Sequence, residues 1–286
     1  GAFTAGTVVG SYSNVVVATS GAVTGNTSVT VTPGALHHIT VSPASPSLVV
    51  GGAQAFTAAT YDQYDNARSG DTIAWSVTNA TAGSIIAGTG AFTAGTVAGT
   101  YSNVVVATSG AVTGNTSVTL TVGPLHHITV SPASPSVTVG GAQAFTAATF
   151  DQYNNARSGD TIVWSVTNAT AGSIIAGTGA FTAGTVAGTY SNVVVATSGA
   201  VTGNTSVTVT PGALHHIAIS PSHPSVVVGG SLTFSATTYD QYNNVRSGDT
   251  VGWNVSGDLA AGNIFYATGV FIAGTIAADY HNVILA

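Results

Sequence analysis

Short stretches in which apolar and polar residues alternate recur along the whole chain. In 72–78, for example, the alternation places Ile73, Trp75 and Val77 on one face, a period of two that is typical of a half-buried strand. Turns rich in Gly and Pro separate the stretches, and no segment shows a helical period. The pattern predicts an all-β sandwich, with strands in one stretch of the chain at 36–42, 53–62, 72–78, 84–94 (two short strands), 100–108 and 115–122.

The same pattern returns every 89 residues. His37-His38 recurs at His126-His127 and His215-His216, and Trp75 recurs at the same spacing as Trp164 and Trp253. Repetition at a fixed period predicts a tandem array of similar units, here a rod-like one. The expected domains are 1–34 (the C-terminal half of a repeat), 35–123, 124–212 and 213–286 (a repeat that lacks its final strand).

Aromatic residues at fixed places in each repeat are expected in the core. A Trp on the third strand suits the space between two sheets. A Tyr that opens the penultimate strand resembles a tyrosine corner, in which the hydroxyl bonds to backbone upstream. The expected core aromatics are Trp75, Trp164, Trp253, Tyr101 and Tyr190.

Several motifs carry a family resemblance that covers the whole chain. The motifs are S-P-x-x-P (42–46), G-G-x-x-x-F-x-A (51–58), a long Y-D-Q-Y-x-N-x-R-S-G-D-T-I-x-W-S-V segment (61–77) and A-G-T-Y (98–101). They resemble the bacterial immunoglobulin-like repeats of the invasin and intimin adhesin type, and related prokaryotic surface-layer and stalk proteins. The resemblance implies an immunoglobulin-like sandwich and an extracellular or cell-surface location. Because repeats of this type mostly act as spacers, the motifs specify the fold well and the function poorly. The strand after Tyr101 departs from the usual Tyr-x-Val pattern of this family, and its additional residues before Val104 imply a β-bulge.

Charge is scarce: 4% of residues are charged, against about 25% in ordinary soluble proteins. The three cations are Arg68, Arg157 and Arg246, and Lys and Glu are absent. Clustered cations are needed to neutralise nucleic-acid phosphates or to hold an anionic membrane surface. Neither partner is therefore expected. The chain has no Cys for a disulfide framework or a thiolate metal site, and no apolar run long enough to span a membrane.

One turn of the first complete repeat is crowded with polar residues, Asp62, Asp65, Asn66 and Asp71. Oxygen-rich turns hold Ca²⁺ in many proteins, whereas Asx side chains also satisfy turn backbone. The second interpretation is preferred, with Arg68 paired to Asp62 or Asp71, because Asp65 becomes Asn in the later repeats. No other cofactor or metal is expected.

The adjacent histidines at each repeat start invite a metal interpretation as well. Neighbouring strand residues point to opposite faces, so His37 and His38 are not expected to chelate together, and a packing role at the joint between repeats is preferred. Catalysis needs a nucleophile, a base and an orienting group placed together. In a chain without Glu, Lys or Cys, nothing singles out such a site, and no enzyme is expected.

Glycosylation is a candidate way to offset the missing charge, because glycans solubilise surfaces. Three of the six Asn-x-Ser/Thr sequons keep the 89-residue period, and we expect them in the turn that opens the last strand. The candidates are Asn26, Asn115 and Asn204, with Asn79, Asn168 and Asn254 in addition.

The two ends match opposite parts of one repeat. Residues 1–34 correspond to 90–123, and 213–286 correspond to 35–107. Two interpretations stay open: a window of a longer array, or copies joined head to tail by strand complementation, with Thr27, Val29 and Val31 on the donor strand. The expected function is therefore a glycosylated surface filament or stalk that associates with copies of itself. The alternatives are an adhesin that binds a host, cell or glycan ligand, and a spacer of a secreted carbohydrate-active enzyme.

Overall fold

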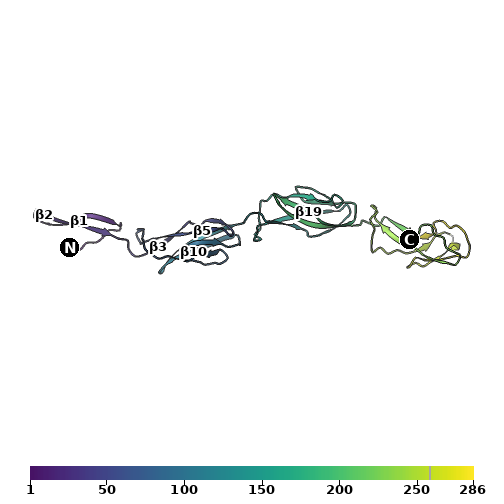
Figure 1. The fold of residues 1–286 in the computed structure, drawn as a ribbon, viewed down its shortest axis with the longest axis horizontal. Coiled ribbons are helices and arrows are strands. Elements are labelled where there is room, and N and C mark those ends of the chain that lie inside the picture. The colour runs from purple at the N-terminus through teal and green to yellow at the C-terminus, as the bar shows by residue number, and fades with distance from the viewer. Residues whose placement is uncertain (258) are drawn as a thin grey trace. The chain divides into compact units, whose positions relative to one another are not determined.

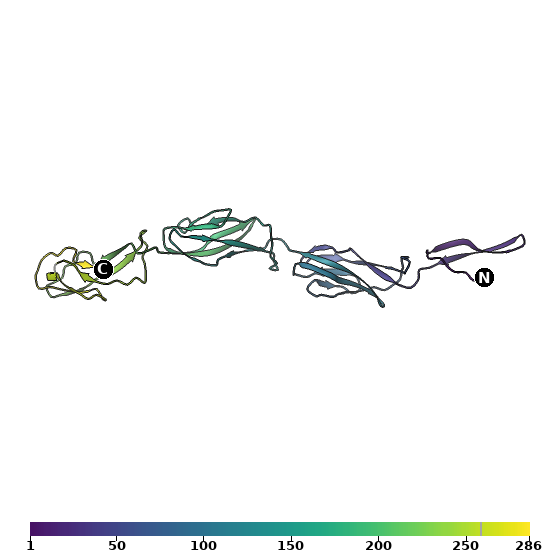
Figure 2. The same cartoon turned by 180° about the vertical axis from the view of Figure 1, so that it is seen from behind.

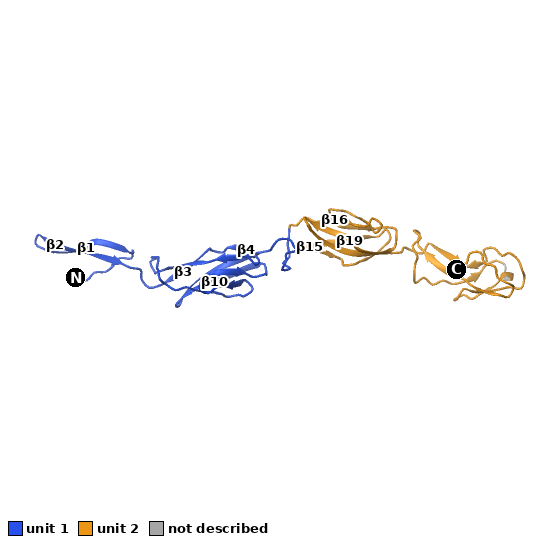
Figure 3. Cartoon of the chain, viewed as in Figure 1, with its two compact units in different colours: residues 1–126, 150–158 blue, residues 127–149, 159–286 orange. Residues whose placement is uncertain are grey.

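The structure, a computed structural model, describes residues 1–257 and 259–286. Nearly all of its regular structure is β-strand, seen from opposite sides in Figures 1 and 2. The described chain divides into two units, residues 1–126 with 150–158 and residues 127–149 with 159–286 (Figure 3). Within the described residues, no helix is long and apolar enough to cross a bilayer.

The first complete repeat is a two-sheet sandwich. One sheet has the order β4-β11-β10-β7, with β4 parallel to β11, and the other face is built from β3-β6 and β5-β9-β8. β5 and β6 follow one another around Phe56, whose backbone N–H donates to the Gly90 carbonyl. This arrangement is the immunoglobulin-like one. Its strands are β3 (His38–Ser42), β4 (Ser47–Val49), β5 (Ala53–Ala55), β6 (Thr57–Tyr61), β7 (Ala74–Val77), β8 (Gly83–Ile85), β9 (Ala91–Ala94), β10 (Gly99–Ser109) and β11 (Val112–Thr121).

The next repeat has the same elements in the same order. Its sheets are β13-β20-β19-β16, β12-β15 and β14-β18-β17. The strands are β12 (His127–Ser131), β13 (Ser136–Thr138), β14 (Ala142–Ala144), β15 (Thr146–Phe150), β16 (Val163–Val166), β17 (Gly172–Ile174), β18 (Ala180–Ala183), β19 (Gly188–Ser198) and β20 (Val201–Thr210).

The flanking segments contain fewer of these elements. Residues 1–34 form a single hairpin, β1 (Gly10–Ser20) with β2 (Val23–Val31). Residues 213–286 form the pairs β21-β23 and β24-β27 and the sheet β22-β26-β25. Their bounds are β21 (His216–Ser220), β22 (Ser231–Thr233), β23 (Ser235–Tyr239), β24 (Asn254–Val255), β25 (Gly262–Ile264), β26 (Val270–Ala273) and β27 (Ile284–Leu285), with a 3₁₀ turn η1 at Leu259–Ala261.

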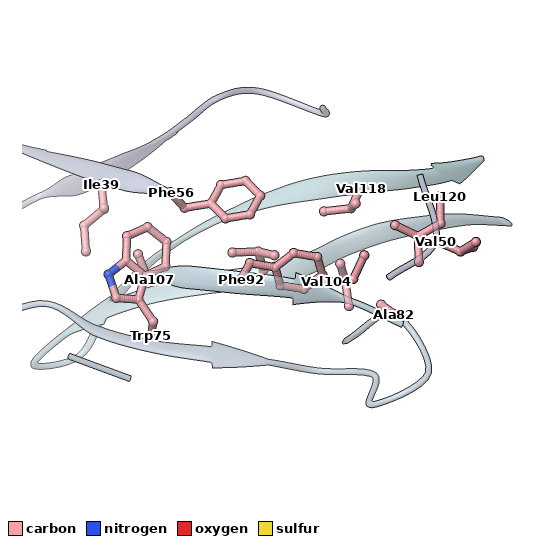
Figure 4. Close-up of a cluster of buried hydrophobic side chains, with 12 residues drawn as sticks. Ile39, Val50, Phe56, Trp75, Ala82, Phe92, Val104, Ala107, Val118 and Leu120 are labelled. Carbon is pink, nitrogen blue, oxygen red and sulfur yellow. The ribbon is translucent and has the colours of Figure 1, made fainter. Parts of the chain in front are cut away.

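Three aromatic rings form the centre of the sandwich core (Figure 4). Phe56 lies 6.3 Å from Trp75 and 5.8 Å from Phe92, measured between ring centroids, and all three are buried. Gly90 packs against the Trp75 ring with φ at +73°, and an added Cβ would lie 2.5 Å from the Phe56 carbonyl oxygen. Glycine is therefore required for this close approach. Trp164 and Trp253 are buried in the same way against Phe145 and Phe234.

The strand that contains the corner tyrosine as its third residue has the predicted bulge. The Tyr101 hydroxyl donates to the Val97 carbonyl at 2.9 Å, and Tyr190 donates to Val186 at the same distance. Both tyrosines remain half-buried. The β10–β11 register shifts between Tyr101 and Val105, with Asn103 at φ +51°. The added residues are thus absorbed by a left-handed Asn, a residue type that tolerates this backbone.

Candidate functional site

The turn after β6 is organised around one buried carboxylate. The Asp62 side chain is 1% exposed. Its Oδ1 accepts the backbone N–H groups of Tyr64 and Asn66 at 2.9 and 3.0 Å. Its Oδ2 accepts the N–H of Gly34, in the linker before the repeat, at 2.8 Å. The carboxylate therefore joins its own turn to the preceding linker.

The neighbouring Asn66 extends this connection to the preceding repeat. Its amide nitrogen donates to the Thr7 carbonyl at 2.8 Å and also to Asp62, while its amide oxygen accepts the Val9 N–H at 3.4 Å. Both neighbouring partners are backbone groups, so the contact does not depend on their side chains. The equivalent amides make the same two contacts: Asn155 with Thr96 and Ala98, and Asn244 with Thr185 and Ala187.

Arg68 binds the same linker residue, Gly34, through its carbonyl group. Its guanidinium binds both Asp71 oxygens, at 2.9 and 3.0 Å, and donates through Nη1 to the Gly34 carbonyl. The arginine thus pairs with Asp71, and Asp62 is engaged by N–H donors instead. We call the triplet Asp–Asn–Arg at each joint the joint clasp; its members are Asp62, Asn66 and Arg68, then Asp151, Asn155 and Arg157, then Asp240, Asn244 and Arg246.

Hydrogen bonds set the protonation state of the buried aspartates. Burial alone would raise the pKa of Asp151, but donors from Gly123, Asn155 and Tyr153 outweigh it and lower the pKa to about 2. The pKa of Asp240 is lowered to about 2 by the same balance, and that of Asp62 is also held well below its ordinary value. Each clasp therefore holds a carboxylate that is ionised at neutral pH.

The three aspartates weighed for Ca²⁺ do not share a centre. Asp62 faces the linker, Asp71 faces Arg68, and Asp65 lies 86% exposed with its Oδ1 3.6 Å from His38 Nε2. Asp65 has φ at +63°, as do Asn154 (+65°) and Asn243 (+63°). This left-handed position suits Asp and Asn alike, which accounts for the substitution between repeats.

The expectation that the paired histidine rings point apart is wrong. The Nδ1 atoms of His37 and His38 lie 3.4 Å apart, and those of His215 and His216 lie 3.3 Å apart. The rule of alternating faces does not apply because His37 precedes β3, where the chain has not yet entered the regular strand.

The sequon asparagines are exposed, but not where the sequence predicted. Asn115 is the fourth residue of β11 and pairs with Val106, and the turn lies earlier, at Gly110. Gly114 lies within β11, and a glycine is required there because an added Cβ would sit 2.3 Å from the Ile39 carbonyl oxygen. The same correction applies to Asn26 in β2 and Asn204 in β20. The exposed sequon residues are Asn26, Asn79, Asn115, Asn168, Asn204 and Asn254.

The suggested donor strand forms one side of an open apolar hollow. On β2, Thr27 is exposed and Val29 and Val31 are half-buried. The two valines line a hollow of about 340 Å³ together with Phe3, Val8, Tyr12 and Val15. The apolar side chains on this face of the hairpin are therefore open to packing by another segment.

The sequence analysis missed the contact from each turn to the repeat before it. Asn66 was noticed only as one polar residue in a crowded turn. The signal was the glycine in each linker, Gly34, Gly123 and Gly212, which keeps the 89-residue period although it lies outside any strand. Its N–H and carbonyl are the groups that the clasp engages.

Comparison with known proteins gives one sequence relative. The chain is 31% identical over 231 residues to Ice-binding protein 1 of Shewanella frigidimarina (strain NCIMB 400), which covers 79% of this chain and 25% of that protein. The chain thus spans about a quarter of the curated relative that it matches. No family model matches the chain.

The chain also aligns with solved structures at low sequence identity. The adhesin FdeC of Escherichia coli is 21% identical, with a TM-score of 0.42 over 86% of this chain and 92% of that one. The extracellular domain of protocadherin GammaB4 is 13% identical, with a TM-score of 0.46 over 90% and 48%. The surface-layer protein rSbsC(31-844) is 18% identical, with a TM-score of 0.32 over 82% and 36%.

Proposed function

We propose that this chain is a non-enzymatic, structural stretch of an extracellular surface protein, in which immunoglobulin-like repeats act as a stalk with restrained joints. The observation that carries the proposal is the joint clasp, present with the same contacts at Asn66, Asn155 and Asn244. A stalk needs each repeat held to the one before it. The clasp supplies that contact through backbone groups that every copy provides.

The physical case depends on what the linkers would do without the clasp. A short Gly-containing linker is flexible by itself, and domain motion is the default where few contacts cross a boundary. Asp62 and Arg68 hold both polar groups of Gly34, and Asn66 holds two backbone groups of the preceding repeat. Bending at the linker would break several hydrogen bonds at once, one of them to a buried ionised carboxylate, which is a strong class of bond.

Single-molecule energy transfer across one joint tests this proposal. The chain has no Cys, so dyes attach only to cysteines introduced at Ser20 and Ser109, which lie at hairpin ends of neighbouring repeats. Asn66→Ala should broaden the distance distribution, whereas Asn115→Ala, an exposed position away from the joint, should leave it narrow. Equal widths in all three proteins would show that the clasp does not restrain the joint.

Glycosylation belongs to the proposal as the hydrophilic coat of a surface with few charges. The support is that all six sequon asparagines are exposed, including Asn115 and Asn204 on their strands. Native material should exceed the 28.0 kDa of the polypeptide, with sugar on at least one of these side chains. A native mass equal to that of the bare polypeptide would remove this part of the proposal.

Strand complementation is the mechanism that we propose for association between copies. The support lies at residues 225–228, which align with β4 but form no strand, and where Val227 is 78% exposed. A segment such as β2, with Val29 and Val31, has the alternation that a strand beside these residues needs. Deleting residues 1–34 should abolish end-to-end association. Association that survives the deletion would mean that another segment pairs with these residues.

Adhesion is the second candidate function, favoured by two neighbouring aromatic side chains. Phe265 and Tyr266 are 57% and 70% exposed, and the Tyr266 ring lies against Gly252, where an added Cβ would be 2.3 Å from the ring. Exposed aromatic groups of this kind serve as binding surfaces in many proteins. Because the Shewanella relative is named an ice-binding protein, ice is included among the surfaces to be tested. Ice-affinity and glycan-array binding by the full chain, lost in Phe265→Ser/Tyr266→Ser, would favour adhesion over a stalk role.

A further inference from the structure

The histidine pairs at the starts of the repeats form a second recurring site, separate from the joint clasp. In the first pair, the His37 and His38 rings are nearly perpendicular, at 88°, with their Nδ1 atoms 3.4 Å apart. In the pair His215 and His216 the angle is 90° and the distance 3.3 Å. The sequence repeats the pair once more at His126-His127.

The second ring of each pair and the backbone of the first residue are held by one tyrosine. His38 stacks on Tyr61 at 5.0 Å with an interplanar angle of 11°, and the backbone N–H of His37 donates to the Tyr61 carbonyl at 2.8 Å. His216 stacks on Tyr239 at 5.0 Å and 10°, and His215 donates to the Tyr239 carbonyl at 2.8 Å. One tyrosine thus fixes the ring of the second histidine and the backbone of the first.

The remaining ring nitrogen of His38 faces a carboxylate. His38 Nε2 lies 3.6 Å from Asp65 Oδ1, an arrangement that favours the proton on Nε2. The Nδ1 atom of His38 then carries a lone pair, and this atom is the one that contacts His37 Nδ1. Metal-binding histidines usually show this arrangement, in which the second ring N–H is oriented by a carboxylate.

The distance between the two nitrogens matches a metal site. A tetrahedral ion with metal–nitrogen bonds of about 2.0–2.1 Å separates two of its nitrogen ligands by about 3.3–3.4 Å. We propose that the pairs His37-His38 and His215-His216 each bind a divalent ion that prefers imidazole, Zn²⁺ or Cu²⁺, through their two Nδ1 atoms. His37 is exposed, so an ion reaches the pair from solvent and water completes its coordination.

The surroundings of the pair define what kind of site this is. No group of three or more His, Cys, Asp or Glu side chains converges among the described residues, so the ion has two protein ligands and exchangeable water positions. Such a site takes up ions reversibly and does not contribute to the core. The chain has a net charge of −6 and no Lys, so no cationic cluster opposes the approach of a cation.

Titration of the full chain with ZnCl₂ and CuCl₂, followed by calorimetry, tests the proposal. The wild-type chain should take up one ion at each of these two pairs, and His37→Gln/His126→Gln/His215→Gln, which leaves no adjacent histidines in the sequence, should lose this uptake. His223→Gln/His281→Gln removes the two histidines outside the pairs and should leave uptake unchanged. Circular dichroism of each variant confirms that the fold is intact. Electron paramagnetic resonance of the Cu²⁺ form should show two equatorial nitrogens in the wild type.

A second variant tests whether the carboxylate beside His38 contributes to ion binding, which it would not do if the ion bound to scattered surface histidines. Asp65→Ala should weaken binding at the first pair by about tenfold, since loss of an orienting partner costs about 10–100-fold in affinity. The pair at His215 already has Asn243 at this position and should bind more weakly than the first. Uptake that persists in the triple glutamine variant, or that is absent from the wild type, would overturn the proposal. The 3.4 Å contact would then be an ordinary hydrogen bond between two neutral imidazoles.

Discussion

The repeat at 35–123 and the segment at 213–286 begin alike and end differently. In the first, β4 pairs in parallel with β11, and Val50, which follows β4, is 6% exposed. In the second, the equivalent stretch 225–228 forms no strand, and Val228 is 56% exposed. The two stretches have similar apolar sequences. What differs is the strand beside them.

This difference shows which strands depend on others. A three-residue strand gains few hydrogen bonds and does not persist without a neighbouring strand. β4 therefore exists because β11 is present. The hairpin 1–34 shows the converse: Val29 and Val31 of β2 remain half-buried, whereas their equivalents on β11, Val118 and Leu120, are 0% and 2% exposed. The core of the repeat thus needs both halves of the sandwich.

The largest expected effect is at the tryptophan of a complete repeat. Trp164 is 6% exposed and lies 6.3 Å from Phe145. Trp164→Ala should destabilise its repeat by about 3–5 kcal/mol, because a large cavity opens between the sheets. Urea denaturation followed by circular dichroism measures the loss. Val163→Ala, at a neighbouring position that is 53% exposed, is the control and should change stability little. A Trp164→Ala cost as small as the control would mean that the ring does not support the core.

A glycine of the last strand tests the same difference between a complete repeat and the hairpin, because its sequence context is the same in both. An added Cβ at Gly203 would lie 2.3 Å from the Ile128 carbonyl oxygen, whereas one at Gly25 would meet nothing within 4 Å. Gly203→Ala should therefore cost about 1–3 kcal/mol from overpacking. Gly25→Ala should be close to neutral in the same denaturation experiment. Equal effects at the two positions would show that β12 does not press on β20 as the structure has it.

These positions also show what the sequence could predict. Alternation and the 89-residue period predicted the sandwich class and the tryptophan positions, because each is local or periodic. The bulge after Tyr101 was predicted from the family resemblance instead. The last strand was expected to begin at Asn115, which left Gly114 outside it, whereas β11 begins at Val112. Only the approach of β3 to β11 explains a glycine within that strand, and this contact joins residues far apart in the sequence.

The joint clasp was only partly predictable for the same reason. The sequence identified the polar turn and preferred a structural role for it. It did not reveal that Asp62 and Asn66 reach the linker and the preceding repeat, since these bonds end on backbone atoms of Gly34 and Thr7. Backbone acceptors leave no residue-type signal. The facing histidine rings were missed because the alternating-face rule was applied one residue before the strand begins.

A smaller effect is expected from acid, and it should be shared by complete and incomplete segments because the clasps at Asp151 and Asp240 are alike. The pKa of each is lowered from 3.8 to about 2. A carboxyl group with a lowered pKa stabilises the folded state above pH 3.8, and this contribution is lost as the pH falls toward 2. Melting temperatures measured from pH 6 to pH 2 should therefore fall below pH 4. Asp151→Asn/Asp240→Asn should flatten that fall, and a fall of unchanged steepness would place the acid sensitivity outside the clasps.

The smallest expected effect concerns the tyrosine corner. The Tyr190 hydroxyl donates to Val186 at 2.9 Å in a complete repeat, and Tyr12 donates to Val8 at 3.0 Å in the hairpin. Replacing either Tyr by Phe removes one hydrogen bond and leaves the ring. Tyr190→Phe should cost about 0.5–1 kcal/mol, the net value of such a bond in a folded domain. Tyr12→Phe should cost less, because the Tyr12 side chain is 38% exposed and water replaces the lost partner. The two variants are compared by urea denaturation of the full chain, with hydrogen exchange at the amides of β1 and β19 locating the change. A larger loss at Tyr12 than at Tyr190 would mean that the corner stabilises the isolated hairpin and that the sandwich core adds nothing to its strength.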